Sequence, residues 1–363
     1  MNLKDKLKAI KPRENAGAMA SNRFDFQKNW AICKLIELSD RNEDFILAFE
    51  FHEDIIVFDS SENQNFIDFY QIKTKNTGKF NLSALLKKQM LKNGDGNSIL
   101  GKLFSNKLNF EKETKSLNIV SNTFFGFKEV KTSKRENICS DELTSEEKDI
   151  IAESISSELK IDWVESFLKL INFSVSDLTI EHHNEITSNK LNKFIEQKFT
   201  SDIKYNPSLA YRTIFDEINR RNNVEKTPSN FDELINYKAV TKADFDKFLK
   251  IVITEPNKII DLKTKIFSIL DANNIKTSER IKLNNSWKDI EIEFLKINNS
   301  FFDNTKKTIA NIIKENLQLL ENNIIESVDL IHKILMQNQT IKKQNLYSEY
   351  FLKLLILIEI YND

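Results

Sequence analysis

The scarcity of glycine and proline is the feature that most constrains the fold of this chain. Only 6 Gly and 4 Pro occur in 363 residues, and these residue types interrupt helices and strands most often. Long helices are therefore expected to dominate. A chain of this length usually forms two or three domains of about 100 to 200 residues each, and its 40% apolar and 29% charged residues are typical of a globular protein.

Neither the net charge nor the cysteine content indicates a partner. Lys and Arg total 53 against 54 for Asp and Glu, so any surface for nucleic acid must be local. Cys33 and Cys139 fit neither a disulfide framework nor a metal-binding motif, as expected in a reducing cytosol. The first 20 residues lack the apolar stretch of a secretory signal, and no run reaches 18 apolar residues. We expect a cytoplasmic protein without a membrane span.

The first third of the chain has the pattern of an α/β domain. Apolar residues at helical spacing predict helices over 23–39, 82–92 and 98–109. Short runs rich in Phe, Ile and Val predict strands, and the expected strands are 45–51, 55–58, 66–74 and 117–120. A helix followed by three strands, further helices and another strand predicts a sheet packed against helices.

The pattern changes after residue 127. Residues 128–144 have no periodic apolar pattern, whereas Thr144 and Glu147 match a capping box that begins a helix. We therefore expect an α/β domain over 1–127, a linker over 128–144 and a mainly helical region over 145–363.

The helical region contains two strongly apolar stretches. Heptad-like spacing over 309–324 is compatible with a helix bundle or a coiled coil, and the bundle is favoured because the repeat does not persist for four heptads. The run 350–361 is interrupted by Lys353 and Glu359, which suits a buried or partner-facing helix. Either stretch is also a candidate surface for self-association.

Three residues of the strand region form a candidate catalytic site. Gln71 and Lys73 project from the same face of one strand, because side chains alternate. Asp54 begins the preceding strand, and antiparallel pairing would bring it beside Gln71, giving the pattern D-x16-QxK. The alternative is an ordinary solvated strand face.

The chemistry suggested by this pattern is phosphodiester hydrolysis. That reaction requires a metal ion that neutralises phosphate charge and activates water. Asp54 would bind Mg²⁺ or Mn²⁺, and the Gln71 side-chain oxygen with the Ile72 backbone carbonyl would supply neutral ligands. Lys73 would orient the water and offset developing negative charge.

A wider resemblance supports this interpretation. The relevant segments are RENAGAMASNRFDFQKNWAICKLIEL, DFILAFEFHEDIIVFDS, IDFYQIKTK, SILGKLFSNKLNF and SLNIVSN. In this order and spacing, over about residues 13 to 125, they resemble the endonuclease domain of bacterial anti-phage effectors. That PD-(D/E)xK domain occurs in CD-NTase-associated effectors and in the nuclease subunit of Lamassu-type, SMC-linked defence. The resemblance implies a restriction-endonuclease-like fold, divalent-metal-dependent cleavage of double-stranded DNA, and catalytic positions at Asp54, Gln71 and Lys73.

The resemblance extends to surrounding residues. Glu37 is a candidate extra metal ligand, because such nucleases often supply a carboxylate from the first helix, although a solvated helix end is the alternative. Gln27 belongs to a family-like FxFQ pattern and is a candidate hydrogen-bond partner near the site. Glu50 and Glu53 flank the hairpin as candidate supports for the metal ligands, with the alternative that one of them is simply exposed. His52 is interpreted as a turn residue.

Lysines are concentrated directly after the candidate site. Residues 73–115 contain ten lysines against three acidic residues, which favours a phosphate-binding surface, although lysine-rich faces are often merely solvated. The candidate DNA contacts are Lys75, Lys79, Lys87 and Lys88.

The helical region is expected to restrain the nuclease. Because residues 145–363 show little strand pattern, we favour a partner-held nuclease subunit with an SMC-like ATPase and an accessory subunit. A homodimer or homotetramer is the expected active form, because a double-strand break needs at least two sites. The alternatives are a cyclic-oligonucleotide-activated effector and a noncatalytic DNA-binding or scaffold protein.

Overall fold

The computed structural model describes residues 16–91, 94–128, 136–162, 166–199, 205–296, 300–321 and 323–361. The chain divides into two compact units. The first comprises Met1–Lys198 and Ile218–Phe245, and the second comprises Phe199–Glu217 and Asp246–Asp363. The chain therefore leaves the first unit, returns to it, and leaves it again.

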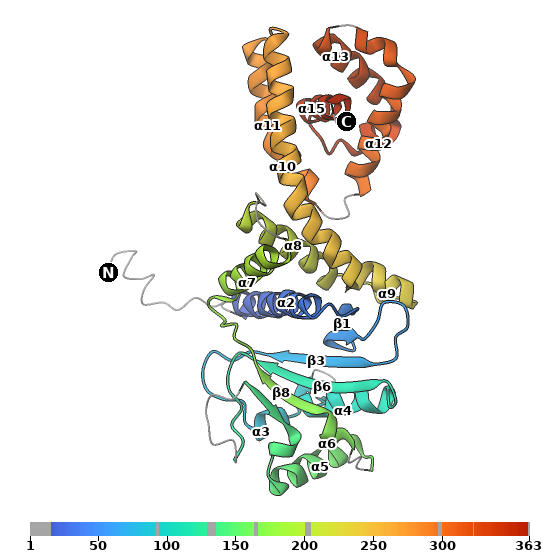
Figure 1. Ribbon diagram of the computed structural model, residues 1–363. Coiled ribbons are helices and arrows are strands. Elements are labelled where there is room, and N and C mark those ends of the chain that lie inside the picture. The colour runs from blue at the N-terminus through green and yellow to red at the C-terminus, as the bar shows by residue number, and fades with distance from the viewer. Residues whose placement is uncertain are drawn as a thin grey trace, which may run out of the picture. The chain divides into compact units, whose positions relative to one another are not determined.

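A seven-stranded mixed sheet organises the first unit (Figure 1), in the order β7-β8-β6-β3-β2-β1-β9. Its strands are β1 (Ile46–Phe51), β2 (Glu53–Phe58), β3 (Ile67–Lys73), β6 (Thr114–Ser121), β7 (Asn137–Cys139), β8 (Ile171–Val175) and β9 (Ala239–Thr241). β3, β6 and β8 run parallel, and the other neighbours pair antiparallel. The carboxyl ends of β3, β6 and β8 therefore meet at one edge.

Helices cover both faces of this sheet (Figure 1). α2 (Ala16–Asp40) and α7 (His183–Lys198) lie on one face. The other carries α3 (Leu82–Leu85), α4 (Ile99–Asn109), α5 (Ser145–Leu159) and α6 (Ser166–Leu170). α4 and α5 approach closely at Gly101, where an added Cβ would collide with the Glu158 carboxylate. Alternating apolar residues pack the second face, including Ile56, Phe69 and Phe104.

The sheet extends further along the chain than the sequence pattern indicates. β7 lies inside the expected linker 128–144, and β8 lies inside the region expected to be helical. The domain boundary expected at residue 127 therefore falls within the first unit. The helix expected over 82–92 is also shorter, because α3 ends at Leu85 and the chain then forms a separate hairpin, β4 (Gln89–Leu91) with β5 (Gly94–Gly96). The capping box of Thr144 and Glu147 is present at the start of α5.

The remaining elements of the described residues are helices. They are η1 (Ser140–Glu142), α8 (Pro207–Asn222), α9 (Phe231–Lys238), α10 (Lys242–Ala272), α11 (Thr277–Leu295), α12 (Ser300–Glu315), η2 (Leu317–Glu321), α13 (Ile324–Leu335), α14 (Gln339–Gln344) and α15 (Glu349–Tyr361). α8 and α10 contribute residues to both units. Among the described residues, no helix has the length and apolar character needed to cross a membrane.

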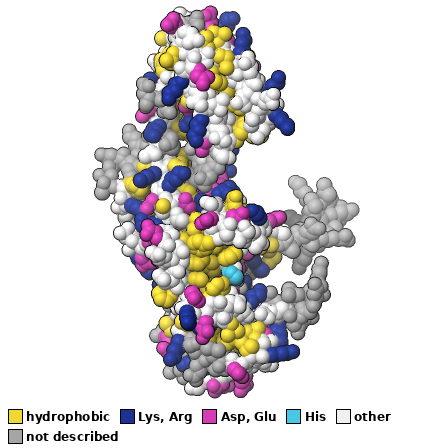
Figure 2. Space-filling view, turned by 90° about the vertical axis from the view of Figure 1, so that its right-hand side faces the viewer, with side chains coloured by type: hydrophobic (Ala, Val, Ile, Leu, Met, Phe, Trp, Pro, Cys, Tyr) yellow, Lys and Arg dark blue, Asp and Glu magenta, His cyan; other side chains and the backbone are white. Residues whose placement is uncertain are grey.

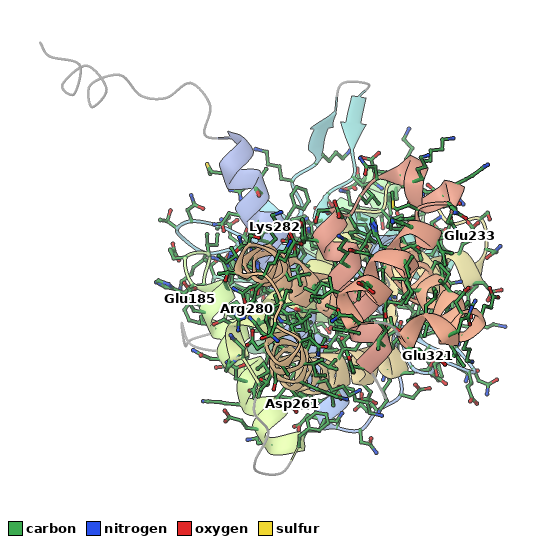
Figure 3. The ribbon with its side chains drawn as sticks, turned by 90° about the horizontal axis from the view of Figure 1, so that it is seen from above. Glu185, Glu233, Asp261, Arg280, Lys282 and Glu321 are labelled. Atoms are coloured by element: carbon green, nitrogen blue, oxygen red, sulfur yellow. The ribbon has the colours of Figure 1, made fainter. Side chains whose placement is uncertain are left out.

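The second unit is a helix bundle built around α15. Five consecutive residues of that helix, Leu354 to Ile358, are buried, and Ile309 and Ile312 of α12 join the same core. The apolar runs proposed as association surfaces are therefore occupied mainly by intrachain packing. Outside this core, Arg280 of α11 (labelled in Figure 3) binds Asp271 through two hydrogen bonds of 2.6 and 3.0 Å.

Candidate nuclease active site

The carboxylate of Asp54 lies at the point where β2 and β3 stop pairing. Ile55 is opposite Tyr70, so Asp54 faces Gln71 across the antiparallel ladder. Asp54 Oδ2 accepts a hydrogen bond of 2.5 Å from Gln71 Nε2 and one of 2.7 Å from the Ile72 backbone N–H. The aspartate side chain thus replaces a strand partner for Ile72, which fixes its carboxylate against β3.

Lys73 completes a group of three side chains on one sheet face. Its Nζ lies 3.8 Å from Asp54 Oδ2. Gln71 is only 3% exposed, whereas the Lys73 and Asp54 side chains are 27% and 16% exposed. A buried carboxamide therefore supports two charged groups that solvent, or a substrate, can reach. The spacing predicted this juxtaposition, and the catalytic role of the three residues stays a prediction.

Two further carboxyl groups adjoin Asp54. Glu53 is 7% exposed and accepts a hydrogen bond of 2.8 Å from Asn106 Nδ2 of α4. Burial and the nearby Asp54 charge raise the pKa of Glu53 to about 8, although Lys73 opposes this shift. The same two causes raise the pKa of Glu50 above its ordinary value. A cation bound beside these groups would favour their ionised forms, because an opposite charge lowers the pKa of a carboxyl group.

An apolar hollow borders this group on the same sheet face. It has a volume of about 340 Å³ and includes Ile56 and Phe69, the cross-strand pair next to Asp54 and Gln71. His52 and Phe110 also line it, with ring centroids 4.9 Å apart. Figure 2 shows hydrophobic side chains gathered beside a histidine on one face of the molecule. A low-dielectric wall strengthens electrostatic interactions among the adjacent charged groups.

Glu37 lies elsewhere. It forms ion pairs with Lys34 at 3.2 Å and Arg41 at 2.7 Å. Burial raises the pKa of Tyr70, and the negative charge of Glu37 contributes to this rise. The Tyr70 side chain projects from the sheet face opposite Gln71. These contacts place Glu37 on the side of the sheet that α2 covers (Figure 1), and its role as a metal ligand stays a prediction.

Gln27 is also on α2. Its side-chain Oε1 is buried and has no hydrogen-bond partner among the described residues, so its predicted contact near the site stays a prediction. Asn106 was not singled out from sequence, although it lies in the family-like segment 98–110. Its contact with Glu53 depends on how α4 packs against the hairpin.

The candidate DNA-binding lysines fall into two groups. Lys75 donates a hydrogen bond of 2.8 Å to the Lys79 carbonyl and lies 4.4 Å from the centre of the Phe80 ring, so its ammonium is occupied within its own loop. Lys79, Lys87 and Lys88 are exposed. The role of all four lysines in DNA binding stays a prediction.

The oxygen-rich donor set fits a hard divalent cation. Asp54 and Glu53 offer carboxylates. Gln71 offers a carboxamide oxygen if its amide group flips, so that Oε1 and Nε2 exchange positions. The Ile72 carbonyl projects to the same side of β3 as its N–H, which is bonded to Asp54. Within the described ranges, no cluster of three or more His, Cys, Asp or Glu side chains is placed to hold a metal. Neutral oxygens would therefore complete the ligand set, as suits Mg²⁺.

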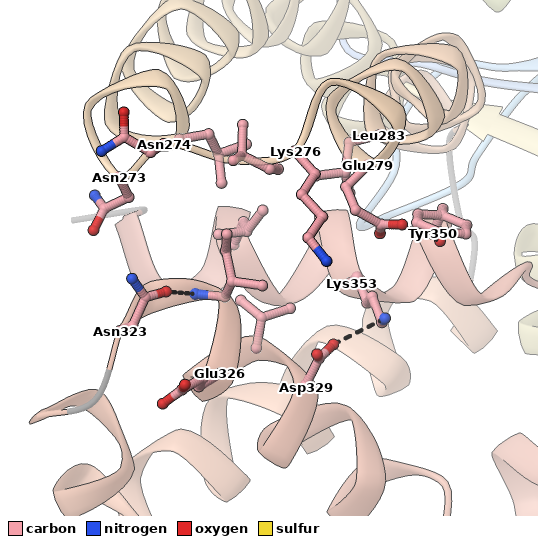
Figure 4. Close-up of a pocket in the computed structure, with 15 residues that line it drawn as sticks. Asn273, Asn274, Lys276, Glu279, Leu283, Asn323, Glu326, Asp329, Tyr350 and Lys353 are labelled. Atoms are coloured by element: carbon pink, nitrogen blue, oxygen red, sulfur yellow. Dashed lines mark hydrogen bonds and ion pairs between the residues drawn. The ribbon is translucent and has the colours of Figure 1, made fainter.

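A second hollow, of about 490 Å³, lies within the helical unit (Figure 4). Lys353 of α15 projects into it and binds Asp329 of α13 at 2.8 Å and Glu349 at 2.6 Å. Tyr350 donates a hydrogen bond to Glu279 and accepts one from Lys282 of α11, also labelled in Figure 3. These contacts cross-link three helices, so we assign the lining a structural role.

An aspartate facing a QxK strand on a mixed sheet is the arrangement expected of PD-(D/E)xK nucleases. The chain belongs to the family described as the Cap4 double-stranded DNA endonuclease domain, whose model matches residues 15–222. It is also 27% identical over 247 residues to the Lamassu protein LmuA of Bacillus cereus (strain VD014). That similarity covers 67% of this chain and 66% of the relative. The nuclease domain of anti-phage systems inferred from sequence is thereby confirmed, and the family match continues well past residue 125.

Proposed function

We propose that this chain is a metal-dependent endonuclease that cleaves double-stranded DNA as the nuclease subunit of a Lamassu-type anti-phage complex. The observation that carries the proposal is the position of Asp54 Oδ2, bonded to Gln71 and Ile72 and 3.8 Å from the Lys73 ammonium. The family match supports the substrate class, and the similarity to LmuA supports the defence system.

Each residue has a distinct task in this proposal. Asp54, with Glu53 beside it, holds the cation, and Gln71 and the Ile72 carbonyl complete the ligand set. When bound, Mg²⁺ or Mn²⁺ neutralises charge on the scissile phosphate and lowers the pKa of a bound water. Lys73 donates to a phosphate oxygen and offsets the charge that develops in the transition state. The exposed Lys79, Lys87 and Lys88 hold the DNA backbone.

We propose that assembly controls this activity. One site of this class cuts one strand, so a double-strand break requires at least two copies, arranged as a symmetric dimer or tetramer. An SMC-like ATPase and an accessory subunit would hold the chain through its helical unit until infection. Cleavage rates that rise more steeply than linearly with protein concentration would support this model, whereas a monomer that makes double-strand breaks with first-order dependence would contradict it.

Cleavage of supercoiled plasmid by the purified full chain tests the catalytic assignment. We expect cutting with Mg²⁺ or Mn²⁺, none with EDTA, and none from Asp54→Ala. The matched control is Asp68→Ala. Asp68 is 19% exposed, pairs with Lys115 at 3.9 Å, and projects from the opposite face of the same strand as Gln71. If Asp54→Ala cuts like the wild type, or if cutting persists in EDTA, the proposed site is wrong.

A further inference from the structure

The segment that follows the family match returns to the nuclease unit. The match ends at residue 222, yet Ile218–Phe245 packs with the first unit. Within this segment, β9 pairs antiparallel with β1, with Leu47 opposite Val240, and α9 also packs against β1. β1 is therefore held between β2 and β9, and residues far along the chain reach the hairpin that carries Asp54.

Lys238, the last residue of α9, makes the most direct contact with that hairpin. Its side chain is 7% exposed, and its Nζ donates a hydrogen bond of 3.2 Å to the backbone carbonyl of Glu50. Burial and the negative charge of Asp54 raise the pKa of the Glu50 carboxyl group, whereas the positive charges of Lys238 and Lys73 lower it. A buried ammonium needs such partners because its desolvation is costly. Lys238 thus joins α9 to the turn just before Glu53 and Asp54.

The hairpin has an unfavourable backbone that requires external support. Glu50 and His52 have φ of 46° and 66°, in the left-handed region that residues other than glycine rarely adopt. Such conformations persist only where surrounding contacts impose them. On one side, the His52 ring packs between Phe51 and Phe110, with centroid distances of 4.6 and 4.9 Å. On the other, Lys238 holds the Glu50 carbonyl.

Arg221 fixes the position of Lys238 independently of the hairpin. Its side chain is 4% exposed, and it donates hydrogen bonds to the backbone carbonyl of Ala239, the residue after Lys238, and to Asp244 at 3.2 Å. One buried guanidinium therefore connects the end of α8, the start of β9 and the start of α10. Contacts within residues 218–245 therefore fix the position of Lys238, and from this position Lys238 donates its hydrogen bond to the hairpin.

We propose that Lys238 is a positioning residue of the nuclease, which holds the β1–β2 hairpin so that Glu53 and Asp54 meet Gln71 and Lys73. This inference rests on the proposed function, because it takes Asp54 as a cation ligand. It also assigns residues 223–245, beyond the family match, to the working nuclease. The C-terminal unit is thereby connected through α10 to the segment that supports the active site.

Lys28 provides a matched control. It is 6% exposed and binds Asp25 at 2.9 Å and Asn219 at 2.6 Å. Both lysines are thus buried tethers between the body of the nuclease unit and the returning segment. Only the tether of Lys238 ends on the catalytic hairpin. Lys238→Met and Lys28→Met therefore remove equivalent buried charges with different expected consequences for the site.

The experiment measures Ca²⁺ binding by calorimetry and hydrogen exchange over residues 46–58 in the full chain. For Lys238→Met we expect about 10-fold weaker Ca²⁺ binding, in the range found when supports of metal ligands are removed, and faster exchange in the hairpin. Lys238→Arg should recover most of both properties, because a guanidinium can also donate to the Glu50 carbonyl. Lys28→Met should lower the melting temperature while leaving the Ca²⁺ affinity near that of the wild type.

Two outcomes would overturn the inference. One is equal Ca²⁺ affinity and hairpin exchange in Lys238→Met and Lys28→Met. The other is failure of Lys238→Arg to recover either property when its melting temperature is normal. A failure of the proposed function would look different, because Asp54→Ala would then bind Ca²⁺ as tightly as the wild type. Hydrogen exchange would still decide whether Lys238 holds the hairpin.

Discussion

The carboxamide of Gln71 donates a hydrogen bond of 2.5 Å to the carboxylate of Asp54 across the β2–β3 ladder. A neutral side chain thus occupies the position where many PD-(D/E)xK nucleases have a second acid. This pairing satisfies Asp54 without adding negative charge beside Glu53. In the proposed function, the carboxylates together with neutral oxygens would consequently hold the metal.

Gln71→Glu should make the protein more dependent on metal. The substitution places a second carboxylate against Asp54, and loss of the hydrogen bond leaves two like charges together. We expect destabilisation by about 1 to 3 kcal/mol in EDTA and a larger gain in melting temperature on adding Mg²⁺ than the wild type shows. Gln71→Met is the control, since it removes the hydrogen bond without adding charge. An unchanged Mg²⁺ response in Gln71→Glu would argue against Gln71 as a ligand position.

Lys73→Ala should slow DNA cleavage by about 10² to 10³-fold, the usual effect of removing a group that stabilises developing charge. Because the side chain is partly exposed, the melting temperature should change little. Lys115→Ala is the matched control, since Lys115 pairs with Asp68 at 3.9 Å as Lys73 pairs with Asp54 at 3.8 Å. Similar rates from the two variants in a single-turnover assay would remove Lys73 from the mechanism.

Replacing Lys87 and Lys88 together by Ala should weaken binding of noncleavable DNA and reduce its salt dependence. The slope of log affinity against log salt should fall by about 0.9 for each lysine that no longer neutralises a phosphate. Lys342 and Lys343 form the control pair, being adjacent, exposed and in the helical unit. Fluorescence anisotropy between about 50 and 200 mM salt measures the slope. Equal slopes for the two double variants would place the DNA surface elsewhere.

The ion pairs of Lys353 should make the helical unit sensitive to acid. Partial burial disfavours the charged lysine, but hydrogen bonds to Asp329 and Glu349 raise the pKa of Lys353 above its ordinary value. The bond from Lys353 lowers the pKa of Glu349 below 4.5. Stability from Glu349 is therefore present above pH 4.5 and is lost as the pH falls through its lowered folded-state pKa.

Lys353→Met should consequently flatten the dependence of melting temperature on pH between about pH 5 and pH 3. Lys333→Met, which removes an exposed lysine of α13, should retain the wild-type slope. Differential scanning calorimetry of the full chain measures both. If Lys353→Met lost stability on acidification as steeply as Lys333→Met, the cross-link between α13 and α15 would contribute little.

Local patterns in the sequence were sufficient for much of the site. Alternation of apolar and polar residues along 66–74 placed Gln71 and Lys73 on one face, because strand side chains have a period of two. The short loop between β2 and β3 allows the two strands to pair antiparallel, which places Asp54 opposite Gln71. The capping box at Thr144 was equally readable, since its hydrogen bonds join residues three apart. Each of these features is encoded by neighbours in the chain.

Tertiary structure alone decided the features that depend on distant residues. The packing of α2 on the sheet, and not the position of Glu37 within the helix, determines which sheet face Glu37 meets. β8 and β9 are too short to carry a periodic signal and exist through pairing with β6 and β1. Lys238 reaches Glu50 across 188 positions of sequence. Such contacts leave no local pattern, because their free energy comes from burial and pairing between segments that meet only in the folded chain.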